Sequence, residues 1–194
     1  MAIFRCFNYS EALTRDNMIR QQKKTANHLI SAYNQMMSEL RNAFDHGEPA
    51  DMSLQKALDM AKHQAVHIGD VSAEEANEIG EYIKRDINDA AEYMMESSAE
   101  FYDWLLLDIE LIERKVMELF LSVADHTRIE LEQFKKDAAP SEQVSIYKSG
   151  QITGPGTLIC ESCGKAKPFL SSDEIPDCSV CGNNRFIRRQ QNDV

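Results

Sequence analysis

The chain has 194 residues and a formal net charge of −11. This length accommodates one medium domain, or a domain with an appendage. All of the net charge lies in residues 1–140, which carry 15 Lys and Arg against 26 Asp and Glu, whereas residues 141–194 carry six of each. An acidic surface repels the phosphate backbone, so residues 1–140 are not expected to wrap DNA or coat RNA.

Apolar residues recur every three or four positions in the first quarter of the chain, which predicts a helix with one apolar face. These residues are Ala26, Leu29, Tyr33, Met37, Leu40 and Phe44. Gly47 and Pro49 are expected to end the helix. Cys6 stands apart from the other four cysteines, and we expect it to be an ordinary thiol.

A second, shorter helix is predicted by the same spacing at Leu54, Leu58, Ala61, Ala65 and Ile68, with Gly69 at its end. His63 and His67 lie four residues apart on it, a spacing at which two imidazoles can share a metal ion. No glutamate follows His63 to complete a metalloprotease motif, and no helix carries the Glu-x-x-His of a diiron bundle. We therefore expect both histidines to be solvated.

A third helical segment opens with Ser72 and Glu75, spaced as a capping box. Its apolar residues continue to Val123 at the spacing of a plain α-helix rather than at a strict heptad repeat. An unbroken helix over residues 73–137 would be about 100 Å long. We therefore expect either a protruding helix or a break, and favour a break between Ser97 and Asp103.

The stretch from Trp104 to Val123 resembles a membrane span in length and leucine content, but it contains six charged residues. A span would keep these positions apolar. We expect an amphipathic helix with a wide buried stripe, and an exposed stripe that binds a partner is the alternative.

Composition changes near Pro140, where glycine, proline and small polar residues replace the helical pattern. The sequence predicts an acidic helical domain over residues 1–137 and a linker over 138–156, with a short extended segment near Ile146. A zinc ribbon over 157–189 and a tail over 190–194 complete the expected organisation.

Four cysteines form two short pairs near the C-terminus, Cys160 with Cys163 and Cys178 with Cys181, with fourteen residues between the pairs. Two residues between cysteines allow one tight turn to supply two corners of a tetrahedral metal site. A glycine follows each pair and suits a turn that needs positive φ. The spacing predicts a zinc ribbon flanked by short strands at residues 157–159 and 185–187.

Redox dithiols and disulfides are weaker interpretations of these cysteines. A thioredoxin-type pair occurs singly at the start of a helix. The chain begins without a basic region followed by an apolar stretch, so we expect a cytoplasmic protein, where disulfides are rare. Iron could occupy the same four sulfurs and is less favoured than zinc. Four thiolates leave no open coordination position, so we expect one structural Zn²⁺ and no catalysis.

Basic and aromatic side chains of the ribbon are candidate contacts for a partner or for nucleic acid, with the basic groups on phosphates and the aromatic ring on a base. They are Lys165, Lys167, Arg185, Phe186, Arg188 and Arg189. The alternative is a solvated strand edge whose charges discourage strand pairing.

The whole layout resembles the YbeL-like family of bacterial zinc-ribbon-containing proteins, a family of unknown function. The ribbon and its approach carry the specific part of the resemblance: Tyr147–Gly150, Gly154–Gly156, Leu158–Cys160 and Cys181–Arg189. Looser likeness extends through Met37–Arg41 and Lys84–Asp86, so that residues 33–189 are covered. The resemblance implies a cytoplasmic bacterial protein with a helical N-terminal region and a C-terminal zinc ribbon. It supplies no activity.

We therefore expect a mainly α protein, in which long antiparallel helices form a hairpin, bundle or coiled-coil-like body before a small C-terminal β zinc ribbon. The expected function is a non-enzymatic zinc-binding adaptor for another protein, without a membrane and with self-association through the helices as an option. The alternative is a nucleic-acid-binding zinc ribbon in transcription or translation.

Overall fold

The computed structural model describes residues 4–46, 53–69, 71–96, 121–128 and 145–188, with side chains described from residue 24 onward in the first helix and up to residue 91 in the third. The helices are α1 (Phe4–His46), α2 (Leu54–Ile68) and α3 (Ala73–Glu96), and residues 121–128 are also helical. The strands are β1 (Ile146–Lys148), β2 (Ile152–Thr153), β3 (Gly156–Cys160), β4 (Ala166–Phe169), β5 (Asp173–Glu174) and β6 (Arg185–Arg188).

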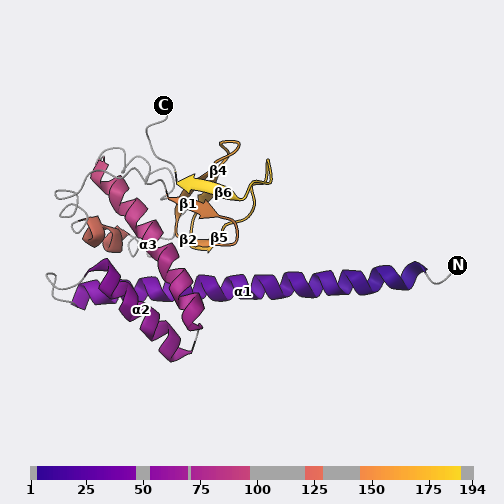
Figure 1. Cartoon of the computed structure of the whole chain (residues 1–194), viewed down its shortest axis with the longest axis horizontal. Coiled ribbons are helices and arrows are strands. Elements are labelled where there is room, and N and C mark those ends of the chain that lie inside the picture. The colour runs from indigo at the N-terminus through magenta and orange to yellow at the C-terminus, as the bar shows by residue number, and fades with distance from the viewer. Residues whose placement is uncertain (1–3, 47–52, 70, 97–120, 129–144, 189–194) are drawn as a thin grey trace.

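The helices form a crossed body, and the strands form a separate layer against it (Figure 1). After α1, the chain turns back into α2, which packs obliquely against the C-terminal part of α1, and α3 also crosses α1. The predicted order of helices followed by a small C-terminal sheet is confirmed. The described helices do not form a long antiparallel hairpin or coiled coil, because α2 has only 15 residues and α3 crosses rather than follows α1.

One apolar core holds the helical body together. It is lined by the predicted face of α1, including Tyr33 and Leu40, by Leu58 of α2 and by Ile83 of α3, each at most 1% exposed. The ribbon contributes Ile152 to the same core. In the part of the chain that is described, no helix has both the length and the apolar character needed to cross a bilayer.

The predicted boundaries of α2 and the start of α3 are confirmed. Ser53 caps α2 by accepting a hydrogen bond from the Lys56 N–H, and Gly69 ends the helix with φ 83°. Ile68, which the apolar spacing assigns to the buried face, is 50% exposed because the helix ends there. Gly47, Pro49 and the expected break between residues 97 and 103 lie outside the described residues.

The capping box of α3 forms as predicted. The Glu75 N–H donates to Ser72 Oγ (3.2 Å), and the Ser72 N–H donates to Glu75 Oε2 (2.9 Å). The hydrogen bond from the Ser72 backbone N–H, with that from its side chain, lowers the pKa of Glu75 from its ordinary value of 4.5. A lowered pKa means that this stabilisation is complete above pH 4.5 and is lost as the pH falls through the folded value.

Removing the cap is expected to weaken the fold measurably. Ser72→Ala should lower the free energy of unfolding at neutral pH by about 1 kcal/mol, because the Glu75 N–H in the first turn loses its acceptor, Ser72 Oγ. Ser38→Ala, at an exposed position inside α1, is the control and should cause no loss, since alanine is the better helix former. Urea unfolding of both variants measures the difference, and equal stability would contradict the role of the cap.

The strands form two antiparallel sheets. The larger has the order β1–β6–β3–β4 and the smaller pairs β2 with β5. Both predicted ribbon strands are present, and they pair directly, with Ile159 opposite Ile187 and Cys160 opposite Phe186. Seven buried residues form the separate core of the ribbon: Tyr147, Leu158, Cys160, Phe169, Ile175, Cys178 and Phe186.

The described part of the predicted linker, residues 145–156, is a folded part of the ribbon. Strand β1 pairs with β6 along its length, from Ile146 opposite Ile187 to Lys148 opposite Arg185. Strand β2 pairs with β5. Gly150, Gly154 and Pro155, which suggested a linker, lie in the connections between these short strands, and Gly150 has a φ of 84°. The predicted boundary at residue 137 lies outside the described residues.

Candidate metal centre

Two turns of the same geometry hold the four cysteines. In each turn the glycine after the second cysteine donates its N–H to the carbonyl of the first, from Gly164 to Cys160 (2.9 Å) and from Gly182 to Cys178 (2.8 Å). Both glycines have the positive φ that the sequence predicts, 70° and 69°. The turns therefore fold back on themselves and leave both sulfurs of each pair on one side.

The four sulfurs meet in one cluster. The Sγ atoms of Cys160 and Cys181 are 3.6 Å apart, as are those of Cys163 and Cys178, and all four lie within 4.8 Å of one another. A tetrahedron with metal–sulfur bonds of roughly 2.3 Å has edges of about 3.8 Å. The cluster thus has the size and the donor set of a four-thiolate metal site, and all four ligands are those predicted.

Backbone N–H groups prepare two of the sulfurs for a cation. Burial of Cys160 opposes ionisation, but the N–H groups of Cys163 and Ser162, with the Asn183 amide, lower its pKa to about 6. The N–H groups of Cys181 and Val180 likewise lower the pKa of Cys178. Metal ligation requires thiolates, so these N–H groups favour the ligand form before any metal arrives.

Cys163 is the cysteine of this cluster that is hardest to ionise. The Lys165 N–H lowers the pKa of this thiol, but burial and the hydrogen bonds of the three neighbouring sulfurs outweigh it and raise the pKa to about 12. The cluster therefore does not accommodate four thiolates by itself. A divalent cation supplies the positive charge that would keep all four ionised together.

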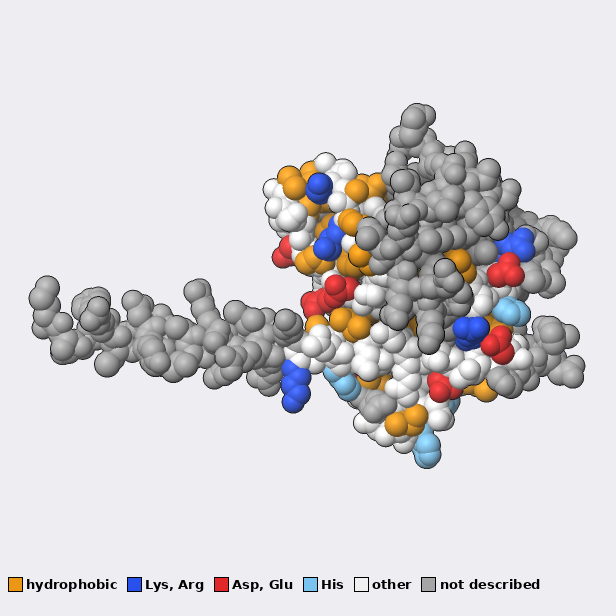
Figure 2. Space-filling view, turned by 180° about the vertical axis from the view of Figure 1, so that it is seen from behind, with side chains coloured by type: hydrophobic (Ala, Val, Ile, Leu, Met, Phe, Trp, Pro, Cys, Tyr) orange, Lys and Arg blue, Asp and Glu red, His pale blue; other side chains and the backbone are white. Residues whose placement is uncertain are grey.

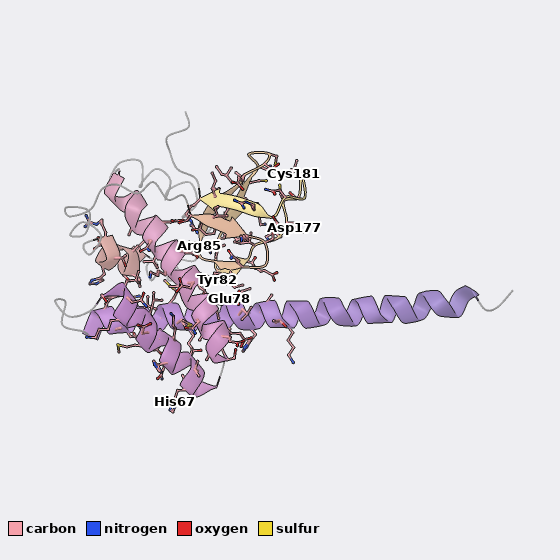
Figure 3. All side chains as sticks on the ribbon, in the orientation of Figure 1. His67, Glu78, Tyr82, Arg85, Asp177 and Cys181 are labelled. Carbon is pink, nitrogen blue, oxygen red and sulfur yellow. The ribbon has the colours of Figure 1, made fainter. Side chains whose placement is uncertain are left out.

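The metal centre lies at the outer end of the ribbon. Figure 3 places Cys181 there, away from the helices, whereas Arg85 lies between α3 and the strands. Among the described residues, these four cysteines are the only group of three or more side chains arranged to hold a metal ion. His63 and His67 are exposed on α2, as expected, and His67 points away from the body.

Two of the six candidate contact residues face inward rather than outward. Phe186 is 1% exposed and belongs to the ribbon core, so its ring is not available to stack on a base. The side chain of Arg188 is 11% exposed and is held by groups of the protein itself. The sequence interpretation is wrong at both positions because alternation along β6 places these residues against the core and against α3.

The other candidates lie at the surface or outside the described residues. Lys165 and Arg185 are exposed, and Arg185 Nε donates to Glu161 Oε2 (2.6 Å). The Lys167 ammonium lies 5.2 Å from the centre of the Phe169 ring. Arg189 is outside the described residues. On the face seen in Figure 2, positive and negative side chains are interspersed and form no basic band among those drawn in colour.

Asp86 of α3 is the centre of a polar cluster between the helices and the ribbon. It is fully buried, and its Oδ2 accepts hydrogen bonds from the Tyr33 hydroxyl (2.8 Å) and the Gly154 N–H (2.7 Å). Its Oδ1 accepts from Arg85 Nε (3.1 Å) and lies 3.7 Å from Arg188 Nη2. One carboxylate thereby joins α1, α3, the β2–β3 turn and β6.

Arg188 and Tyr147 complete this cluster from the ribbon side. Arg188 donates to the hydroxyls of Tyr147 (2.9 Å) and Thr153 (3.0 Å), and the Tyr147 hydroxyl donates to Asp89 Oδ2 (2.5 Å). Arg85 lies over the Tyr147 ring, 3.8 Å from its centre. Burial favours the neutral form of Arg188, but Tyr147, Asp86 and Asp89 raise its pKa above the ordinary value, so the guanidinium stays charged. Two guanidinium groups are thus balanced by two carboxylates.

Sequence reasoning missed this cluster, although one signal was present. Asp86 follows Ile79 and Ile83 at the spacing of the buried face of α3, so it is a charged residue at a core position. Charged residues are almost never fully buried unless they are paired. The distant partners of Asp86 could not be found in this way, because they come from residues 33, 154 and 188.

Comparison with known proteins agrees with the metal centre. A family described as a zinc-ribbon containing domain matches residues 43–190. The uncharacterized protein YbeL of Escherichia coli (strain K12) is 23% identical over 163 residues, which cover 84% of this chain and 97% of that protein. The YbeL proteins of two further Escherichia coli strains align to the same extent. No solved structure matches the chain. Because the family match spans most of the chain and includes all four clustered cysteines, the chain belongs to the zinc-ribbon-containing, YbeL-like family, whose function is unknown.

Proposed function

We propose that this protein is a non-enzymatic adaptor that binds one structural Zn²⁺ and presents its zinc-stabilised ribbon to another protein. The observation that carries the proposal is the closed metal centre: four thiolates fill a tetrahedral coordination sphere and leave no position for water or substrate. Zinc is the preferred ion because four cysteines in two matched turns form its usual structural site. Iron is the alternative ion.

Exposure of the metal-binding turns supports a docking role. Cys163 and Cys181 are exposed, and Val180 between the cysteines of the second turn is 66% exposed. An apolar side chain at the tip of a metal-fixed turn can be covered by a protein partner with little loss of side-chain entropy. The acidic helical body then acts as the carrier of the ribbon.

Co-purification of a partner with tagged full-length protein from bacterial cytoplasm tests the adaptor function. A protein partner should remain after nuclease treatment and should be lost from a Val180→Asp variant, which places a charge at the tip of the turn. Val66→Asp is the matched control, since Val66 is 38% exposed on α2, and it should retain the partner. Equal recovery with all three proteins would contradict docking through the ribbon tip.

The second candidate is nucleic-acid binding through Lys165 and Arg185, the described basic candidates that remain exposed. It has lost support from Phe186 and Arg188, which are buried. Fluorescence anisotropy with a labelled single-stranded oligonucleotide discriminates the two functions. Binding that weakens steeply with salt and is abolished by Lys165→Glu with Arg185→Glu would favour nucleic acid. The adaptor proposal expects no such binding.

The adaptor proposal extends to the assembly and location of the protein. We place it in the cytoplasm, where four free thiols remain available to zinc. Self-association through the helices, including a coiled-coil-like pairing of α1 between copies, belongs to the same proposal. Light scattering of the purified protein at several concentrations distinguishes a monomer from such a dimer.

A further inference from the structure

The buried polar cluster connects the metal centre to the helical body through a short path. Strand β6 starts four residues after Cys181, and it carries Arg188 to Asp86 and Asp89 of α3. The neighbouring strand β3 ends at the ligand Cys160, and Leu158, two residues earlier, pairs with Arg188. Strand β6, which begins close to the ligand Cys181 and pairs with the strand that ends at the ligand Cys160, is therefore also the strand that brings Arg188 to α3.

Hydrogen bonds at the second turn strengthen this connection. The Asn183 side-chain amide donates to Cys160 Sγ (3.6 Å) and to the Arg185 carbonyl (2.9 Å). It thereby joins a ligand of the first cysteine pair to the first residue of β6. Displacement of the sulfurs would move the start of the strand that ends at Arg188.

In the docked state, charged side chains of α3 are paired with groups of the ribbon. Arg85 of α3 donates to the Gln151 side chain (2.7 Å) and to the Ile152 carbonyl (3.0 Å), both from the ribbon. Asp86 accepts a hydrogen bond from the Gly154 N–H, and Asp89 accepts one from the Ser145 hydroxyl (2.7 Å). If the ribbon unfolds, these charged groups of α3 lose their ribbon partners and become hydrated there, so the body cannot keep this face in its docked form without a folded ribbon.

From these contacts we propose that metal binding and docking of the ribbon on α3 are coupled, so that metal occupancy controls whether the Arg85–Asp86–Asp89 face of α3 is covered. This coupling does not depend on which macromolecule the ribbon binds. With the metal bound, the ribbon is folded and covers the face. With the metal removed, β6 loses its fixed start, and the face is exposed to solvent and to partners.

Coupling is reciprocal, so changes on α3 must alter the affinity of the distant metal site. Asp86→Asn and the milder Asp89→Asn both weaken docking from the helical side without touching a cysteine. Each should reduce zinc affinity of the full-length chain by at least about fivefold, the low end of typical coupling between two sites. Competition with a chromophoric zinc chelator measures this affinity. Glu81→Gln, the same loss of charge at an exposed position of α3, is the control and should bind zinc as the wild type does.

Amide hydrogen exchange tests the opposite direction. The Gly154 N–H, which donates to buried Asp86, should exchange slowly in zinc-loaded protein and much faster after chelation. The Ala57 N–H, bonded to the Ser53 carbonyl at the start of α2, is the control and should change little. Unchanged zinc affinity in both α3 variants would overturn the proposal, as would unchanged Gly154 exchange after chelation. If Asp86→Asn does not fold, Asp89→Asn decides the affinity test.

Discussion

Replacement of Asp86 by asparagine is expected to lower the free energy of unfolding by about 3–5 kcal/mol, the usual cost of breaking a buried ion pair from one side. Asp86 is fully buried, and donors surround both of its oxygens. Without its negative charge, Arg188 keeps its ion pair with Asp89, but Arg85 loses the pair with Asp86, and its largely buried positive charge is left uncompensated.

Asparagine also cannot reproduce the hydrogen bonds of the carboxylate. Oδ2 faces the Tyr33 hydroxyl and the Gly154 N–H, and Oδ1 faces the two guanidinium groups. The amide nitrogen of asparagine, itself a donor, must therefore face donors in either orientation. Burial and the charge of Asp86 raise the pKa of Tyr33, so this hydroxyl stays protonated at neutral pH. Its oxygen can turn to accept a hydrogen bond, but the Gly154 N–H and the two guanidinium groups can only donate.

Guanidinium chloride unfolding of metal-loaded protein measures this effect. Glu81→Gln removes the same charge from an exposed position of α3 and should change the free energy of unfolding by less than about 0.5 kcal/mol. The difference between the variants then reports burial rather than net charge. A loss below about 1 kcal/mol for Asp86→Asn would contradict the conclusion that this cluster holds the helices and the ribbon together.

Local sequence signals predicted those parts of the fold that depend on neighbouring residues. The helix cap at Ser72 and the end of α2 at Gly69 each follow from contacts within a few residues. The four metal ligands also belong to this class, because each cysteine pair forms one turn and only two such turns are present. The two residues between the cysteines of each pair, and the glycine that follows, are enough to predict where the ligands lie.

The parts that could not be predicted depend on contacts between distant residues. Nothing near Ile152 indicates that its side chain joins the helical core, and the glycines around it suggested a linker. Arg188 looked like a surface cation because it lies with Arg185 and Arg189 at the end of a short strand, yet its carboxylate partners are Asp86, more than 100 residues earlier, and the nearby Asp89. Burial of one charged residue can be inferred from helical spacing, but the identity of its partners cannot.

Because the ribbon core and the helical core are largely separate, we expect removal of the metal to affect them differently. Chelation, or the change Cys178→Ser, is expected to unfold the ribbon, residues 145–188, while most of the helical structure remains. The ribbon core has seven buried residues, two of which are metal ligands, so it depends on the metal, which contributes about 10–16 kcal/mol in comparable small modules. Among the described residues, the helical core contains 18 buried side chains, and Ile152 is its only described member from the ribbon.

Circular dichroism measures the helical content, and two-dimensional NMR measures the folding of the ribbon strands. The helical signal at 222 nm should fall only slightly, and the dispersed amide resonances of the strands should collapse to random-coil positions. Cys6→Ser is the matched control, because Cys6 is remote in sequence from the four clustered cysteines, and this variant should keep its metal and its spectrum. Persistence of the strand resonances without metal would contradict the structural role of the site. Loss of most of the helical signal would mean that the Asp86 cluster transmits ribbon unfolding to the whole helical body.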